Sequence, residues 1–161
     1  MKEKKNEIEF EQLVREHRST IYTVCYMFSS DQDEVNDLFQ EVLINLWKSF
    51  SSFEGRSQVN SWIYRVSLNV CISLDRKKKR HRTEPLVMDI NPYEEEDANS
   101  RQMEMLRKRI AKLGPFDRAI IMLWLENMSY DEIGAIVGIT AKYVSVRLYR
   151  IKEELKKMNN K

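Results

Sequence analysis

The residues with the most distinctive chemistry lie near the C-terminus, on one side of a predicted helix. They combine two cations, two phenol rings and a branched apolar group at helical spacing: Lys142, Tyr143, Val146, Tyr149 and Arg150. A face that serves only as solvent cover gives no reason for this mixture, whereas such side chains can contact phosphates and base edges in a DNA groove. This face is therefore a candidate surface for reading nucleic acid.

The elements that must position this face are two short helices in sequence. The opposite side of the second helix carries an apolar stripe at i, i+4, i+7 and i+11 that predicts burial: Val144, Leu148, Ile151 and Leu155. Ser129 and Glu132 form a capping box that predicts the start of the first helix, and Gly138 suits its end. Thr140 can cap the second helix. Two helices joined by a short turn that contains glycine form the helix-turn-helix pattern; the alternative, an ordinary helical hairpin of a bundle, is less compatible with the exposed side chains.

A second cationic set lies at 76–82, where six of the seven residues are lysine or arginine. Like charges one turn apart destabilise a helix, so a polyanion would relieve their repulsion. Arg65 and Asn69 share one face of the same predicted helix. Three aromatic residues upstream could stack on single-stranded bases: Phe53, Trp62 and Tyr64. The alternative that Trp62 is a core residue stays open, and periodicity does not decide for the other two.

A third candidate surface is an acidic stripe on the predicted helix 33–50. The stripe gathers carboxylates, an amide, a lysine and an isoleucine: Asp33, Asp37, Gln40, Glu41, Ile44 and Lys48. Trp47 lies at its edge. Acidic helix stripes are most often solvated faces. An apolar residue set among acids would also suit docking on a basic partner helix.

The composition predicts an all-α protein of two small domains joined by an acidic flexible linker. The 161 residues include only four glycines and three prolines, and no strand-like alternation is sustained. Charge is segregated, with net balances of +2 for residues 1–82, −6 for 83–100 and +6 for 101–161. We expect the middle segment to be the linker, since it holds two prolines and only negative charges. The expected helices are 7–28, 33–50, 61–80, 101–113, 116–127 and the C-terminal pair, with a loop at 49–60.

The remaining residue types give little support for an enzyme. His17 and His81 have no paired nucleophile or metal-ligand spacing. Cys25 and Cys71 sit in apolar helical patterns without metal spacing, so we expect buried thiols and neither a metal nor a cofactor. The N-terminus has no apolar run and no stretch is long enough to span a membrane, which predicts a cytoplasmic protein without membrane insertion.

Three sequence blocks, in this order and spacing, resemble the sigma factors of the extracytoplasmic-function group within the bacterial sigma-70 family. They are DEVNDLFQEVLINLW (33–47), FEGRSQVNSWIYRVSLNV (53–70) and the long block 113–155, which runs from LGPFDRAIIMLW to LYRIKEEL. The resemblance extends over about residues 8–157. It implies region 2 at 1–82, with binding of core polymerase and recognition and melting of the minus-ten promoter element. It implies region 4 at 101–161, with recognition of the minus-thirty-five element, and a linker at 83–100 in the RNA exit path.

The resemblance also implies roles for individual residues. Those implied to dock on the clamp helices of the largest subunit of core RNA polymerase are Asp37, Gln40, Glu41, Ile44 and Trp47. Those implied to surround an extruded minus-ten base or its neighbours are Arg56, Ser57, Gln58, Trp62, Arg65 and Asn69, followed by the phosphate-binding residues Arg76, Lys77, Lys78 and Lys79. Those implied to contact the minus-thirty-five duplex are Lys142, Tyr143, Ser145, Val146, Arg147, Tyr149 and Arg150, of which Arg147 is expected to brace the backbone.

The resemblance has two departures and one competing interpretation. The family often has Gly-Thr where this chain has Lys142-Tyr143, and often has Asp at the position of Ser73. The implied partners are core RNA polymerase, promoter DNA and an anti-sigma factor. The competing interpretation is a stand-alone helix-turn-helix regulator, usually a dimer on a palindrome; such a regulator needs neither the acidic stripe nor the cationic run.

Overall fold

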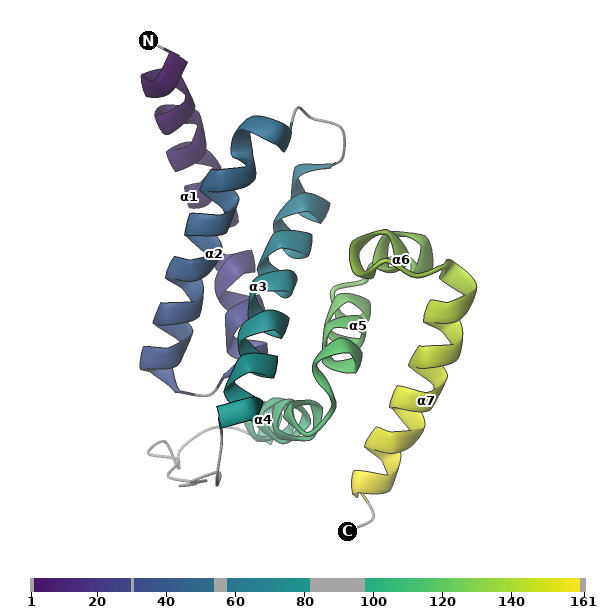
Figure 1. The fold of residues 1–161 in the computed structure, drawn as a ribbon. Coiled ribbons are helices and arrows are strands. Elements are labelled where there is room, and N and C mark those ends of the chain that lie inside the picture. Colours follow the sequence, from purple (N-terminus) through teal and green to yellow (C-terminus); the bar gives the residue numbers. More distant parts are fainter. Residues whose placement is uncertain (1, 30, 54–57, 82–97, 160–161) are drawn as a thin grey trace.

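The computed structural model describes residues 2–29, 31–53, 58–81 and 98–159, and within these ranges every element is a helix (Figure 1). The helices are α1 (Lys2–Phe28), α2 (Gln32–Phe53), α3 (Val59–His81), α4 (Ala98–Ala111), α5 (Pro115–Leu125), α6 (Tyr130–Val137) and α7 (Ala141–Asn159). The predicted all-α class is confirmed. The expected linker at 83–100 lies mostly outside the described residues; α4 begins within its last three positions.

The N-terminal module consists of α1, α2 and α3, which pack side by side. Their apolar positions meet in one core, for which Val24, Val42 and Ile63 are fully buried examples. Cys25 of α1 and Cys71 of α3 are free, buried and hydrogen-bonded with each other, so the prediction of buried thiols is confirmed. The helices α1 and α3 begin earlier than predicted, at Lys2 and Val59; the first turn of α1 is polar, so apolar periodicity does not reveal it.

The predicted loop at 49–60 was too long, because α2 continues through Ser49 to Phe53. The serine hydroxyls that suggested a loop donate to backbone carbonyls of the same helix: Ser49 Oγ to Asn45 O (2.9 Å) and Ser52 Oγ to Ser49 O (2.9 Å). The two phenylalanines in this stretch supply packing across helices, and Phe53 stacks on the Trp62 ring with centroids 4.6 Å apart. Tertiary packing of aromatic rings therefore overrides the local preference of serine for turns.

The C-terminal module consists of α4 to α7 and is organised around α5. Pro115 occupies the first turn of α5, where no backbone donor is needed. Every residue from Arg118 to Leu123 is buried, which makes α5 the central helix of this module. The helices α6 and α7 both pack on α5, so their buried stripes share its surface.

The helix-turn-helix begins and turns as the sequence predicts. Ser129 Oγ accepts from the Glu132 amide (3.1 Å), and Thr140 Oγ1 accepts from the Tyr143 amide (3.2 Å). Gly138 ends α6 with φ of 85°, a left-handed conformation that costs glycine little. A Cβ at Gly134 would lie 2.4 Å from the Ile139 carbonyl oxygen. The turn can close only because position 134 has no side chain.

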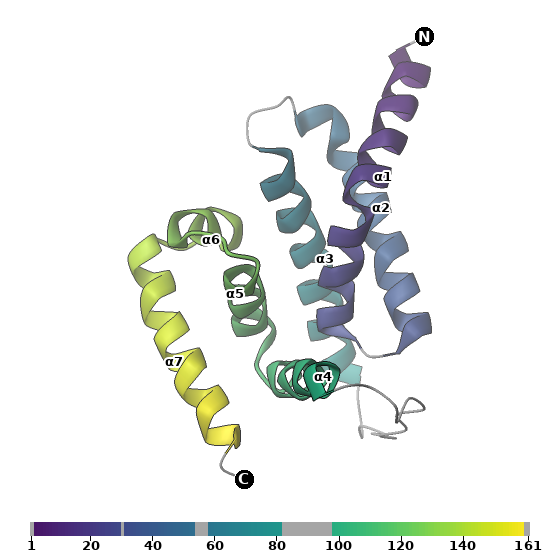
Figure 2. The same ribbon diagram turned by 180° about the vertical axis from the view of Figure 1, so that it is seen from behind.

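The two modules pack against each other: α3 lies along α5 and α6, and α1 contacts α4 and α5 (Figure 2). Arg107 of α4 donates to the carbonyls of Tyr26 (2.7 Å) and Ser29 (3.0 Å) at the end of α1. Arg118 of α5 lies over the Phe28 ring, 5.0 Å from its centroid. Both arginines belong to the C-terminal module. Arg107 satisfies two carbonyls of the N-terminal module, and Arg118 covers one of its rings.

Candidate nucleic-acid interface

The outer face of α7 is fully open to solvent. All the expected reading residues except Arg147 are exposed: Lys142, Tyr143, Ser145, Val146, Tyr149 and Arg150. The exposed fractions of Tyr143 (58%) and Tyr149 (68%) are large for aromatic side chains. On the opposite side Val144, Leu148 and Ile151 are buried, and Leu155 is half-buried. The predicted division of α7 into a buried stripe and an exposed mixed face is confirmed.

Arg147 differs from the other residues expected to contact the duplex. Its side chain is half-buried, its Nη2 donates to Asp117 Oδ1 of α5, and its guanidinium lies 5.2 Å from the Phe116 ring centroid. The Nε atom is buried. Asp117 could not be identified from the sequence as the partner of Arg147, since a pair separated by 30 positions leaves no local signal.

Trp62 and Tyr64 on α3 are core residues, the alternative that the sequence left open. Trp62 is 6% exposed and stacks against Phe53, with an interplanar angle of 29°. Tyr64 is 5% exposed, and burial raises the pKa of its phenol to about 12. The negative charge of Glu126, just after α5, adds to this increase in pKa, and a hydrogen bond with Thr20 opposes it.

The polar residues expected at the minus-ten site are only partly brought together. Arg65 is half-buried, and its Nη2 donates to the Ala135 carbonyl of α6 (2.9 Å). Asn69, one turn further along α3, is exposed, and so is Gln58 just before α3. Arg56 and Ser57 lie outside the described residues. The cationic residues form the last turns of α3, where Lys77 is exposed; the others are Arg76, Lys78 and Lys79.

The acidic stripe occupies the outer face of α2. Asp33, Asp37, Gln40, Glu41 and Lys48 are exposed, and Ile44 (46%) and Trp47 (44%) are half open. The Trp47 ring is held edge-on by Phe10 of α1, with centroids 5.1 Å apart. Within the described residues α2 packs on α1 and α3 alone, so the C-terminal module leaves this face uncovered.

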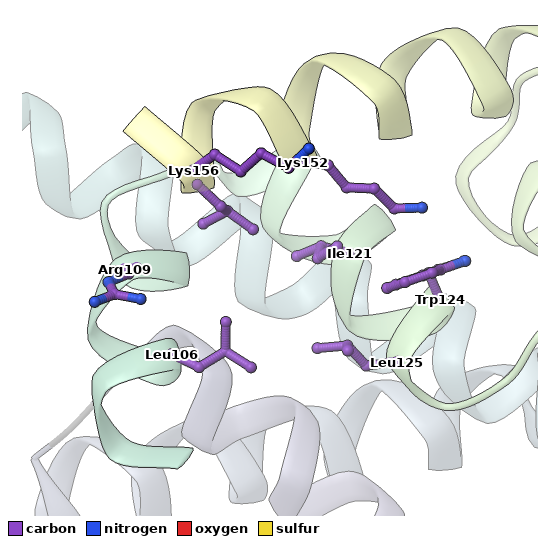
Figure 3. A pocket seen from close by; sticks show the side chains of 8 residues that line it. Leu106, Arg109, Ile121, Trp124, Leu125, Lys152 and Lys156 are labelled. Carbon is purple, nitrogen blue, oxygen red and sulfur yellow. The ribbon is translucent and has the colours of Figure 1, made fainter. Parts of the chain in front are cut away.

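A shallow hollow of about 330 Å³ lies between α4, α5 and the second half of α7 (Figure 3). Its apolar floor includes Leu106, Ile121 and Leu155. Cations surround it, and Lys152 Nζ lies 3.9 Å from the Trp124 ring centroid. The hollow is on the side of α7 that packs toward α5, away from the reading face.

Two absences were found in the part of the chain that the structure describes. No three histidine, cysteine or carboxylate side chains gather where they could hold a metal ion. Across the same described ranges, no helix has both the length and the apolar composition needed to cross a bilayer.

The two modules each match a family model. Sigma-70 region 2 matches residues 13–81, which lie in α1 to α3, and Sigma-70, region 4 matches residues 103–155, which lie in α4 to α7. The chain is 28% identical over 155 residues to the ECF RNA polymerase sigma factor SigE of Mycolicibacterium smegmatis, covering 91% of this chain and 60% of SigE. It is 29% identical over 163 residues to the ECF RNA polymerase sigma factor SigW of Bacillus subtilis, covering 92% of this chain and 87% of SigW.

The fold is also that of solved sigma factors. The structure superposes on RpoE of Bartonella quintana, solved with the anti-sigma factor NepR, with a TM-score of 0.72 and 22% identity over 94% of this chain and 97% of RpoE. It superposes on CnrH, solved with the cytosolic domain of CnrY, with a TM-score of 0.69 and 22% identity over 94% of this chain and 87% of CnrH. The chain belongs to the sigma-70 family of RNA polymerase sigma factors, in the extracytoplasmic-function group. It is a sigma factor that directs transcription initiation.

Proposed function

We propose that three helical faces divide the work of this sigma factor. The acidic face of α2 docks on the clamp helices of the largest polymerase subunit, the polar and cationic face of α3 holds and melts the minus-ten element, and the outer face of α7 reads the minus-thirty-five duplex. The corresponding domains are 1–82 and 101–161, joined by 83–100. The family models support the division, since each matches one module.

The observation that carries this proposal is the exposure of a chemically distinct face on each of the three helices. The face of α2 offers carboxylates around Ile44 and Trp47, which suits a basic helix with an apolar contact. The face of α7 offers two cations and two phenols, all of them exposed to solvent. A solvated surface would not separate acids and cations onto different helices in this way.

On α3 we assign the roles by side-chain chemistry. Asn69 and Gln58 can donate and accept hydrogen bonds at base edges, and Arg65 can do so after leaving Ala135. The cationic turns at 76–79 hold phosphates and steer the strand without reading sequence. Trp62 supports this surface from beneath through its stacked pair with Phe53. We place the extruded base at the segment 54–57, which lies outside the described residues.

The proposal includes no catalytic residue and no cofactor, because polymerase carries out the chemistry. We expect the chain to act in the cytoplasm, where polymerase and the promoter are. Two similar sigma factors were solved with an anti-sigma factor or with the cytosolic domain of a partner, so we also expect an anti-sigma factor for this chain. A stand-alone helix-turn-helix regulator is disfavoured, since it has no use for the acidic face of α2.

Charge reversal on α2 tests the docking step. Asp37→Arg with Glu41→Arg should abolish co-purification with core polymerase and run-off transcription, because two attractive contacts become repulsive, while the thermal unfolding of the chain stays unchanged. The matched control is Glu9→Arg with Glu16→Arg, which reverses two exposed acids of α1. Undiminished binding of the α2 variant to core polymerase would overturn the assignment.

A further inference from the structure

In addition to the apolar packing of α7 on α5, an ion pair joins the two helices close to the reading face. Arg147 Nη2 and Asp117 Oδ1 join the two helices, with 31% and 23% of their side chains exposed. Arg147 lies at the boundary between the buried stripe and the reading face, since it is one turn from both Val144 and Arg150. The pair therefore sits where it can fix the rotation of α7 about its own axis.

The surroundings of Arg147 hold its guanidinium against α5. The group lies over the Phe116 ring, 5.2 Å from its centroid, and the Nε atom is buried. The reading-face neighbours Tyr143 and Tyr149 extend into solvent with exposed fractions of 58% and 68%. A phosphate contact would require Arg147 to leave both a ring and a carboxylate.

Asp117 has its own reason to stay where it is. It lies in the first turn of α5, where backbone donors are unpaired and the helix dipole favours a negative charge. Gly114 at the N-cap has no side chain to satisfy those donors. The carboxylate is thus stabilised from two sides, by the start of α5 and by Arg147.

We propose that Arg147 is a positioning residue: through Asp117 it sets the orientation of α7 on α5, and thereby the promoter sequence that Lys142, Val146 and Arg150 read, without contacting DNA itself. This inference rests on the proposed reading of the minus-thirty-five element by α7. Further along α7, Lys152 lies over Trp124 of α5 (Figure 3), which holds the second half of the helix independently. The ion pair controls the half that enters the groove.

The test uses holoenzyme reconstituted with core polymerase and the full chain. Wild-type holoenzyme first selects a minus-thirty-five sequence from duplexes randomised at that element. Binding to the selected duplex and to a scrambled duplex is then compared for Asp117→Asn, Arg147→Gln and the double variant. The control is Glu153→Gln, which removes a carboxylate of α7 from an exposed pair with Lys156.

We expect either single change to lower the ratio of selected to scrambled binding by about fivefold, since an ion pair of this exposure contributes up to about 1 kcal/mol. The double variant should be no worse than either single one, because one interaction is lost in all three. The slope of log affinity against log salt should stay that of wild type. The control should keep the wild-type ratio.

A phosphate contact gives the opposite pattern. Arg147→Gln would then weaken both duplexes equally and reduce the salt slope by about 0.9, and Asp117→Asn would strengthen binding by freeing the guanidinium. That pattern, or an unchanged ratio in both single variants, overturns the positioning role. If wild-type holoenzyme selects no sequence at all, the proposed reading by α7 is what fails, and a double-mutant cycle on urea unfolding of the free chain still measures the coupling of Asp117 with Arg147.

Discussion

The two surfaces that we assign to DNA differ in how free they are. The reading face of α7 is exposed along its length, and its supporting contacts all lie on the buried side. The corresponding face of α3 is partly occupied, since Arg65 donates to the Ala135 carbonyl and the Tyr64 phenol is buried close to Glu126. The first surface is ready for a duplex, whereas the second must separate from the C-terminal module to present Arg65.

The difference matches the chemistry that we assign to each surface. The minus-thirty-five element is double-stranded before melting begins, so the reading face of α7 can bind it without any rearrangement. Single-stranded DNA forms only during melting. Until then, the hydrogen bond from Arg65 to the Ala135 carbonyl prevents the half-buried guanidinium from lacking a partner. If α3 binds the minus-ten element as we propose, the contact between the modules must rearrange in the promoter complex.

The largest expected effect concerns the buried phenol at that contact. The folded state holds the Tyr64 proton more tightly than the unfolded chain, because burial and Glu126 raise its pKa from 10.0 to about 12. The stability contributed by this group is therefore fully present below pH 10 and is lost as the pH rises toward 12, by about 3 kcal/mol in total.

Urea unfolding of wild type and Tyr64→Phe between pH 9 and pH 11.5 measures this loss. The free energy of unfolding of wild type relative to the variant should fall with pH over this window, and Glu126→Gln should reduce the fall. Parallel pH profiles of wild type and Tyr64→Phe would show that the phenol titrates alike in both states.

The second prediction concerns the open face. Arg150→Ala should weaken holoenzyme binding to the selected minus-thirty-five duplex by about 1–3 kcal/mol, since a cation on this face can form hydrogen bonds with a base edge. The loss on a scrambled duplex should be clearly smaller. Lys157→Ala, in the last turn of α7, is the matched control. Equal losses on both duplexes would mean that Arg150 touches phosphate only.

The third prediction concerns the contact that holds the two modules together and so keeps the C-terminal module packed against α3. Arg107→Ala removes two hydrogen bonds from α4 to the end of α1 and should weaken the packing of the modules by about 1–2 kcal/mol, a value reduced for partial exposure. Small-angle scattering should then show a larger radius of gyration for the free chain. Arg101→Ala, an exposed arginine of the same helix, should leave the radius unchanged. No difference between the two variants would mean that Arg107 does not hold the modules together.

The features that could be predicted from the sequence are those that depend on near neighbours in the chain. The Ser129 cap, the Gly138 turn and the stripe that includes Val144 follow from spacings of a few residues, and all three are confirmed. The expected order of the two modules along the chain came from the resemblance to the family.

The contacts that could not be predicted join distant positions. Arg65 and Ala135 are 70 residues apart, and the carbonyl that accepts the hydrogen bond has no side-chain signal. Asp117 lies 30 residues before Arg147 and looks like an ordinary acid in a first turn. The aromatic packing that lengthens α2 likewise depends on Phe53 meeting Trp62 of another helix.

The smallest predicted effect concerns α6, a helix that contacts both α3 and α7. This helix supplies the Ala135 carbonyl to α3 and supports α7 through the turn at Gly138. Ser129→Ala removes its N-cap and should lower the free energy of unfolding by about 1 kcal/mol in urea. Ser73→Ala, an exposed serine within α3, should change it far less. If α6 couples the two surfaces, the cap variant should also raise hydrogen exchange at the amides of both α6 and the first turn of α7, because α6 contacts both α3 and α7. If hydrogen exchange rises in α6 alone, the packing of α7 on α5 is sufficient to hold α7 in place without support from α6.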